Sequence, residues 1–414
     1  MSRYFLAILV LLTVGASAQT QYHPSAKLPA ELVLSGDWYS MSHAGAAAPT
    51  LRTNHTLARL SIGFIGSSRF GLEWDTTRTT VPLLVHGSYA WRVIRAGQPQ
   101  PWVLVQPVEA FRILLQGLDP RITYTFELIT TAGPIPSPTL PSATAAMVER
   151  FRDRAGLQGQ FLDLKGVFAD RTVTWLSAAT NPKPDLNVLI LGDSLADGLV
   201  PLNASGASHP FGALVSWPAR SVELAAAYLP TPRNPRIINH SFRGWWGCNL
   251  ALPFMGFPTE AAFRIANPWV HPRFDQILDR SHLAAPTFKT TGPVDLVIYQ
   301  LAQNDIATGR LANPTAYQAD IVNNVNLIRA TWPAAKVLVC ATHLGTPNGL
   351  AQRNLMHQAL LSLGYRSDPQ LHFVDTGRIL QTLGFPPQPA HPLPLVHDLW
   401  AFVYALELWS FLQL

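Results

Sequence analysis

The chain has 414 residues, of which 48% are hydrophobic and only 13% are charged. This composition is typical of a globular protein with a large core and excludes a disordered chain. The formal net charge is +5, but the basic residues are scattered, whereas nucleic-acid binding needs them clustered. We therefore expect no nucleic-acid partner, and the length predicts two domains.

The first 18 residues have the features of a secretory signal. Arg3 precedes an apolar run from Tyr4 to Val14, and the small residues ASA at 16–18 provide a cleavage site. We expect a cleaved signal peptide at 1–18 and a secreted or periplasmic protein. The apolar stretch at 399–414 contains Glu407 and is shorter than a membrane span, so we expect a docked terminal helix and no membrane span.

Short strand-like runs broken by turn residues fill the chain from 31 to 135. Their regular spacing predicts an all-β sandwich of the jelly-roll-like type. The proline-rich stretch at 132–143 indicates an extended connector, and we assign 136–181 as linker and connecting segment. The expected strands lie within 57–66, 69–75, 81–87, 89–95, 101–107, 111–118 and 123–130.

Apolar strands alternate with helical patterns from 182 to 414. The strands are expected within 187–192, 236–241, 294–302, 335–343 and 371–377, and two of the helices within 213–229 and 316–332. Such alternation predicts an α/β domain whose parallel sheet is buried on both faces. Because chemistry gathers at the carboxyl ends of parallel strands, the polar residues there become candidates: Asp193, Ser194, 241–244, 303–305 and His343.

The first of these strand ends carries the sequence LGDSLADG at 191–198. It places Ser194 between a buried strand and a helix, where helix N-terminal N–H groups favour a developing negative charge. A serine at this position could instead cap the helix, since serine and aspartate both favour that role.

Three further blocks follow in order: NHSFRG at 239–244, AQND at 302–305 and PLVH at 394–397. Together the four blocks resemble those of the SGNH, or GDSL-type, hydrolases. The resemblance implies a flavodoxin-like three-layer domain. It also implies Ser194 as nucleophile, His397 as base, and the Gly244 backbone with the Asn304 side chain as oxyanion hole. A serine hydroxyl needs such a base to become a good nucleophile.

The blocks depart from the family pattern at three positions. Ser241 replaces the usual earlier glycine of its block, which leaves Gly247 as a spare candidate, and Ala302 replaces another glycine. Pro394 stands where the family has the aspartate that orients the histidine. Either a backbone carbonyl holds His397 in a Ser–His dyad, or another acid does so; the neighbouring Asp398 is the candidate.

The remaining signals concern ligands. Trp245 and Trp246 follow Gly244 and are candidates for substrate binding, whereas Trp217, Trp269 and Trp400 are expected in the core. No cofactor fingerprint and no metal-binding pattern of histidines and cysteines is present, so we expect neither a cofactor nor a metal. Cys248 and Cys340 could form a disulfide or remain as buried thiols.

A sandwich followed by an SGNH domain is similar to the two-domain carbohydrate esterases. This resemblance implies an exported serine esterase that removes acetyl groups from a polysaccharide. A polysaccharide O-acetyltransferase of the same fold and a glycan-binding protein that has lost catalysis remain as alternatives. A lipase or thioesterase would differ from the main hypothesis by preferring long acyl chains.

Overall fold

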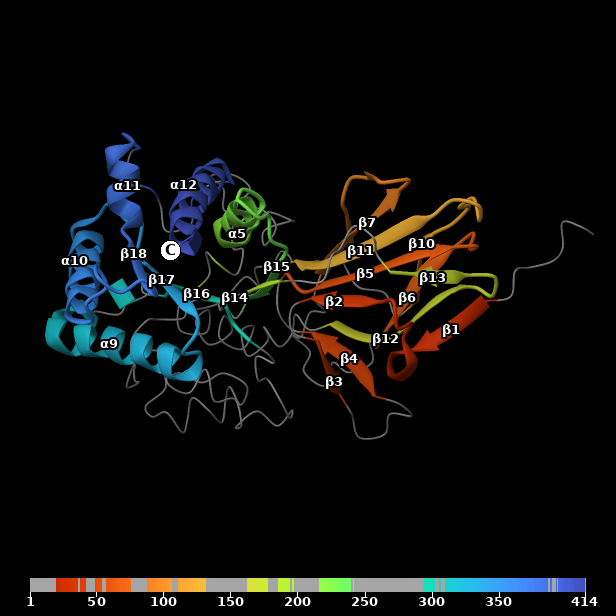
Figure 1. The fold of residues 1–414 in the computed structure, drawn as a ribbon, viewed down its shortest axis with the longest axis horizontal. Coiled ribbons are helices and arrows are strands. Elements are labelled where there is room, and N and C mark those ends of the chain that lie inside the picture. The colour runs from red at the N-terminus through yellow and green to blue at the C-terminus, as the bar shows by residue number, and fades with distance from the viewer. Residues whose placement is uncertain are drawn as a thin grey trace, which may run out of the picture.

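The computed structural model describes residues 20–35, 38–41, 49–53, 57–75, 88–105, 111–131, 162–177, 185–193, 196, 216–239, 241, 293–301, 305–306, 310–385, 388, 392 and 394–413. These residues form an all-β unit and an α/β unit that lie side by side (Figure 1). The expected signal peptide at 1–18 and the expected strand at 81–87 lie outside the described residues.

The all-β unit is a sandwich of two antiparallel sheets. The first sheet has the order β10-β6-β12-β4-β3, with β1 also paired to β12, and the second has the order β13-β5-β11-β7-β8, with β2 on β5 and β9 on β7. The strands of the first sheet are β1 (Thr20–Pro24), β3 (Tyr39–Met41), β4 (Thr50–Thr53), β6 (Phe70–Trp74), β10 (Phe111–Leu115) and β12 (Leu162–Asp170). Those of the second are β2 (Val33–Ser35), β5 (Arg59–Ile65), β7 (Ser88–Arg95), β8 (Gln98–Pro99), β9 (Val103–Val105), β11 (Tyr124–Thr131) and β13 (Thr174–Leu176).

Alternating side chains of the two sheets fill the space between them. Leu60, Ile62 and Phe64 of β5 share one buried cluster with Phe70 and Trp74 of β6. Because successive residues of a strand point to opposite faces, this period of two directs one face of each sheet into the core.

The sandwich is larger than its expected range of 31–135. Strand β1 precedes that range, and β12 and β13 lie within 136–181, the segment expected to serve as a linker. Strand β12 pairs with β6, β4 and β1, so it holds a central place in its sheet. The expected boundaries are therefore wrong on both sides, since the sheet is completed by strands distant in sequence.

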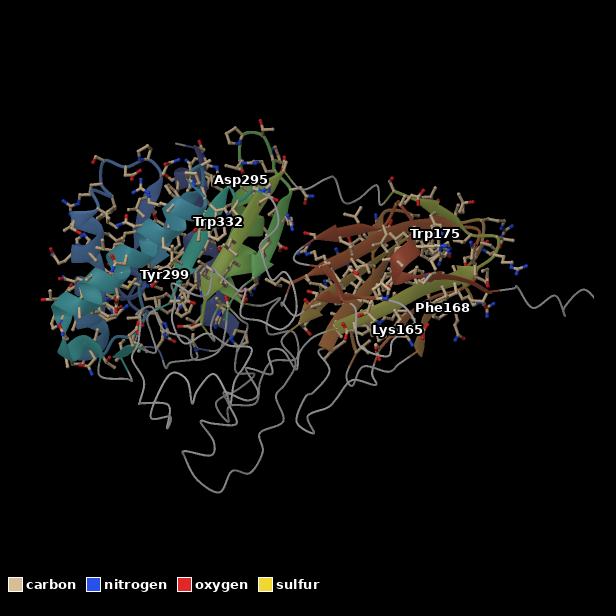
Figure 2. All side chains as sticks on the ribbon, turned by 90° about the horizontal axis from the view of Figure 1, so that it is seen from below. Lys165, Phe168, Trp175, Asp295, Tyr299 and Trp332 are labelled. Carbon is tan, nitrogen blue, oxygen red and sulfur yellow. The ribbon has the colours of Figure 1, made fainter. Side chains whose placement is uncertain are left out.

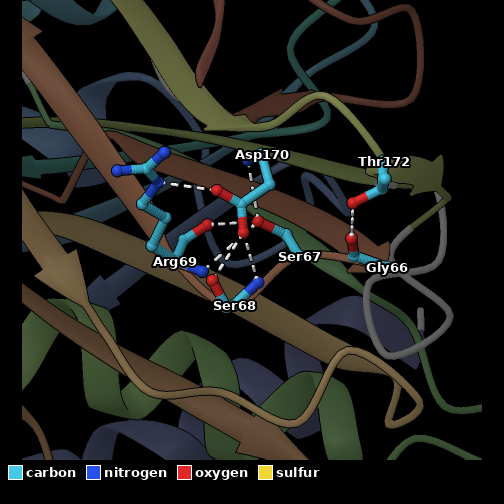
Figure 3. A network of polar contacts seen from close by, with 6 residues as sticks. All are labelled: Gly66, Ser67, Ser68, Arg69, Asp170 and Thr172. Carbon is cyan, nitrogen blue, oxygen red and sulfur yellow. Dashed lines mark hydrogen bonds and ion pairs between the residues drawn. The ribbon is translucent and has the colours of Figure 1, made fainter. Parts of the chain in front are cut away.

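A buried carboxylate ties the end of β12 to the turn between β5 and β6 (Figure 3). One oxygen of Asp170 accepts hydrogen bonds from the Ser68 backbone N–H at 2.7 Å and the Ser68 hydroxyl at 2.6 Å. The other oxygen pairs with Nε of Arg69 at 2.6 Å. Burial alone would raise the pKa of Asp170, but the Ser68 hydrogen bonds and the Arg69 charge outweigh it and hold the pKa below its ordinary value.

The α/β unit contains five parallel strands in the order β15-β14-β16-β17-β18. They are β14 (Leu186–Gly192), β15 (Pro235–Asn239), β16 (Leu296–Gln300), β17 (Lys336–Cys340) and β18 (Leu371–Val374). This is the flavodoxin-like order, in which the switch point lies between the first and third strands. The predicted fold class, an α/β domain with a parallel sheet preceded by a β-sandwich, is confirmed.

Helices cover both faces of this sheet, which explains why its strands are almost wholly apolar. One face packs against α9 (Pro314–Thr331) and α10 (Pro347–Ser362), and the other against α5 (Trp217–Ala227), α11 (Thr376–Thr382) and α12 (Pro394–Gln413). The short helices η1 (Ser25–Lys27) and η3 (Arg310–Ala312) complete the described elements. Helices α9 and α10 begin at proline after an Asn313 or Thr346 cap, a favourable start because proline needs no N–H partner there.

Helix α12 is the expected terminal helix, and it begins five residues before the stretch at 399–414. By length and composition alone it could cross a membrane. In the structure it docks on α5, where Trp217 and Tyr404 stack with ring centroids 4.1 Å apart. Trp409 also donates a hydrogen bond from Nε1 to the backbone oxygen of Tyr228, at 3.0 Å.

The sandwich packs directly on the α/β unit. Leu57, Ala90 and Ile129 of the sandwich belong to the same buried cluster as Val188 of β14 and Val222 of α5. This continuous core means that the two domains support each other.

Candidate active site

The candidate site begins where β14 ends at Gly192. A Cβ atom built on Gly192 would lie 2.4 Å from Cβ of Ala196 and 2.7 Å from Oγ of Ser241. Such contacts are too short, so only glycine fits here. Ala196 therefore lies directly against the end of the strand. Ser194 lies outside the described residues, whereas Asp193 is described and fully buried.

The end of the neighbouring strand β15 is joined to Ala196 by a hydrogen bond. The buried side chain of Asn239 donates from Nδ2 to the backbone oxygen of Ala196 at 2.9 Å. Its Oδ1 accepts from the backbone N–H of Ser241 at 3.2 Å. Asn239 thus joins the first two sequence blocks. The sequence suggested only that these blocks share one edge of the sheet.

Two buried polar oxygen atoms lie close to Gly192, one near the end of each neighbouring strand. Oγ of Ser241 and Oε1 of Gln300 are both buried and have no hydrogen-bond partner among the described residues. Ser241 follows β15, and Gln300 is the last residue of β16, in register with Gly192. Buried polar atoms are usually paired, so an unpaired group in a native protein calls for an explanation such as a ligand or a water.

The opposite edge of the same sheet shows the usual pairing (Figure 2). There Oδ2 of Asp295, just before β16, accepts from the backbone N–H of Asn187 at 2.6 Å and from its side-chain amide at 3.1 Å. Polar groups at the amino ends of these strands are therefore paired by hydrogen bonds. The unpaired oxygens of Ser241 and Gln300 lie at the carboxyl ends.

Two histidines lie at this carboxyl edge on the side of α12. His343 follows β17 and is 3% exposed, and His397 in the first turn of α12 is fully buried. Trp400 lies between them, with its ring centroid 4.6 Å from that of His343 and 5.2 Å from that of His397. The sequence placed Trp400 in the core, and it is buried; its contact with both imidazoles was not foreseen.

Nδ1 of the His397 ring faces a hydrogen-bond donor. The backbone N–H of Trp217, at the start of α5, lies 3.4 Å from this nitrogen. In a Ser–His–Asp triad the histidine instead donates from Nδ1 to an acid. The N-terminus of α5 therefore points at the imidazole, and its backbone N–H is the contact seen at Nδ1.

Asp398 does not approach the imidazole as an orienting acid would. Its carboxylate forms an ion pair with Arg220 of α5, and its side chain is 46% exposed, whereas His397 is fully buried. Neighbouring residues of a helix point in directions about 100° apart, which accounts for the separation.

Several candidates lie outside the described residues: Ser194, Gly244, Gly247, Asn304, Trp245, Trp246 and Cys248. Cys340 is described as a free thiol whose pKa is raised by burial. Over the described ranges, no group of three or more His, Cys, Asp or Glu side chains is arranged to hold a metal ion.

Comparison with solved structures shows the same fold over nearly the whole chain. A family two carbohydrate esterase from Cellvibrio japonicus matches with a TM-score of 0.63 and 14% identity, covering 95% of this chain and 98% of that one. A family two carbohydrate esterase from Clostridium thermocellum in complex with cellohexaose matches with a TM-score of 0.61 and 14% identity, covering 92% and 99%. An acetyl xylan esterase from the rumen bacterium Butyrivibrio proteoclasticus matches with a TM-score of 0.60 and 12% identity, covering 95% and 99%.

No protein-family model and no curated protein matches the sequence. The likeness is therefore one of fold: the chain shares the two-domain architecture of these structures, with an α/β domain that follows a β-sandwich. Fold alone does not specify activity, which has to be argued from the site.

Proposed function

We propose that the protein is an exported serine esterase that hydrolyses acetyl, or other short acyl, esters on a polysaccharide. The observation that supports this most directly is the carboxyl edge of the sheet. There the described parts of three sequence blocks, at Asp193, Ser241 and Asp305, follow adjacent strands, and His397 of the fourth block lies on the helix beside them. The carbohydrate esterases that share the fold indicate the substrate class.

The proposed reaction has two acyl-transfer steps. The hydroxyl oxygen of Ser194 attacks the carbonyl carbon of the ester while its proton passes to His397. The Gly244 backbone and the Asn304 amide donate hydrogen bonds to the resulting oxyanion. The C–O bond to the sugar then breaks, and the sugar oxygen takes the proton from His397. Water attacks the acyl-enzyme, gives one proton to His397 and releases acetate, and Ser194 recovers its proton.

Hydrolysis of aryl acetate, butyrate and octanoate by the wild type and by Ser194→Ala tests this proposal. We expect the wild type to prefer acetate and Ser194→Ala to lose about 10³-fold or more in kcat. Ser367→Ala is the matched control, because Ser367 is an exposed serine in the loop before β18; its activity should equal that of the wild type. A preference for octanoate would contradict the proposal and indicate a lipase or thioesterase.

The donor that faces Nδ1 of His397 favours a second candidate, a glycan-binding protein that has lost catalysis. Its signature would be binding of an acetylated polysaccharide by a wild type that hydrolyses no aryl acetate. Equal binding by Ser194→Ala would support this second candidate.

A further inference from the structure

The outer face of the first sheet of the sandwich carries an exposed aromatic ring beside two charged side chains. We propose that Tyr22, Glu73 and Lys165 form a saccharide-binding surface, which holds a chain of pyranose sugars with equatorial hydroxyls against the sandwich. This surface is separate from the candidate active site, because β1 lies toward the end of the sandwich remote from the α/β unit (Figure 1). Binding there needs no ester chemistry, so the inference goes beyond the proposed function.

The strand register places these groups on the outer face of the sheet. Leu72 and Trp74 point into the core, so Glu73 between them points outward. Gly166 of β12 is the register partner of Glu73. The Tyr22 ring lies against this glycine, since a Cβ atom built on Gly166 would lie 2.7 Å from both Cε2 and Cζ of the ring. The missing side chain therefore gives the ring room to approach the sheet.

The Tyr22 ring is both accessible and fixed. Tyr22 is 44% exposed, and its hydroxyl donates a hydrogen bond to the backbone oxygen of Lys165 at 3.0 Å. The next residue, His23, accepts a hydrogen bond at Nε2 from Nε1 of Trp175 at 3.2 Å, which ties β1 to β13 of the other sheet. A ring held in this way loses little conformational freedom when a ligand binds.

The two charged side chains place a hydrogen-bond donor and an acceptor side by side. Nζ of Lys165 lies 2.9 Å from Oε1 of Glu73, and the side chains are 43% and 26% exposed. An ammonium group has three donors and a carboxylate has two acceptor oxygens, so both retain capacity beyond their own pair. Burial raises the pKa of Tyr22, and a hydrogen bond with Glu73 and its charge raise it further. The carboxylate therefore adjoins the phenol.

This combination of groups suits a sugar ring. A pyranose whose hydroxyls are all equatorial exposes only C–H groups on its faces, and the negative face of an aromatic ring attracts them. Neighbouring hydroxyls at the sugar edge can donate to Glu73 and accept from Lys165 in charge-assisted hydrogen bonds. The ion pair by itself does little for the fold, since an exposed pair contributes about 0–1 kcal/mol.

Isothermal titration calorimetry with cellohexaose and with xylohexaose tests the proposal, because the sugars of both chains have equatorial hydroxyls. We expect the wild type to bind at least one of them. Tyr22→Ala should raise Kd about tenfold, Glu73→Gln about five- to tenfold, and Tyr22→Phe, which keeps the ring, less than about threefold. The Tm of each variant shows whether the fold is intact.

The matched control is another exposed tyrosine. Tyr228 follows α5 and is 75% exposed, so Tyr228→Ala removes an equally accessible ring from a different surface and should leave Kd unchanged. Equal Kd in the wild type and Tyr22→Ala would overturn the proposal, because the oligosaccharide would then bind elsewhere. An equal increase of Kd in Tyr22→Ala and Tyr228→Ala would overturn it as well.

Hydrolysis of aryl acetate separates this surface from the proposed function. Tyr22→Ala should leave kcat and KM for aryl acetate unchanged, since this small substrate needs no second site. A wild type that binds an oligosaccharide through Tyr22 but hydrolyses no ester would overturn the proposed function and leave the surface standing. A wild type that hydrolyses aryl acetate but binds neither oligosaccharide would overturn the surface and leave the proposed function standing.

Discussion

The Asp170 cluster of the sandwich and the carboxyl edge of the α/β sheet are both buried and polar, yet they are built differently. Both carboxylate oxygens of Asp170 are engaged, by Ser68 and by Arg69. At the sheet edge, Oγ of Ser241 and Oε1 of Gln300 are buried without a partner among the described residues. Both oxygens of the Asp170 cluster are paired, whereas the edge retains groups that could bind something further.

This difference separates polar groups that stabilise from polar groups available for function. An unsatisfied buried polar group costs about 1–3 kcal/mol relative to a paired one. The fold tolerates that cost beside Gly192, whereas the carboxylate of Asp170 is paired. The comparison can be tested by removing a polar group from each region and by adding a carboxylate near His397.

The largest expected effect on stability comes from Asp170→Asn. Removing the charge weakens the hydrogen bonds from Ser68 and leaves the partly buried Arg69 without its ion pair. We expect a loss of about 2–3 kcal/mol in the free energy of unfolding, measured by urea denaturation, with kcat for aryl acetate unchanged. A loss below about 0.5 kcal/mol would contradict the structural role given to this carboxylate.

The same variant makes a prediction on pH. The folded-state pKa of Asp170 lies below the ordinary value of 3.8, so its carboxylate adds stability above that pH, and this contribution disappears as the pH falls through the folded-state pKa. The stability difference between wild type and Asp170→Asn should be constant from neutral pH to about pH 5 and shrink in more acidic solution. A difference that grows on acidification would contradict the direction of the shift.

A smaller effect, on catalysis, is expected from Pro394→Asp. A carboxylate one turn before His397 would favour the ring form protonated on Nδ1, by accepting a hydrogen bond from it, and would also benefit from the N-terminus of α12. We expect kcat for aryl acetate to rise about tenfold, which corresponds to about 1.4 kcal/mol. Leu395→Asp is the control, since Leu395 is 77% exposed. An equal change in both variants would show that the added charge acts in another way.

The smallest effect is expected from Ser241→Ala. Because its hydroxyl has no partner among the described residues, its removal should leave the free energy of unfolding unchanged or raise it by less than about 1 kcal/mol. Ser221→Ala is the comparison, since the Ser221 hydroxyl donates to the Pro218 backbone oxygen at 2.8 Å; its removal should cost about 1 kcal/mol. A larger loss for Ser241→Ala than for Ser221→Ala would mean that Ser241 has a structural partner.

Sequence patterns predicted the α/β unit better than the sandwich. All five parallel strands lie where near-continuous apolar runs indicated them, because a strand buried on both faces has a strong signal. Helix α10 was missed, although Thr346 and Pro347 form a cap and a first turn, since its residues alternate little between apolar and polar. Strands β12 and β13 were missed because they follow a proline-rich stretch and pair with strands far away in sequence.

The sequence by itself determined the fold class and the strand ends at which the candidate residues lie, because burial period and residue type are local properties. The tertiary structure alone decided what surrounds His397. The N–H of Trp217 comes from a helix 180 residues earlier in the chain, and His343 comes from a different strand end. Asp398, adjacent in sequence, pairs instead with Arg220. Orientation of a side chain depends on packing between distant elements, and no local pattern records it.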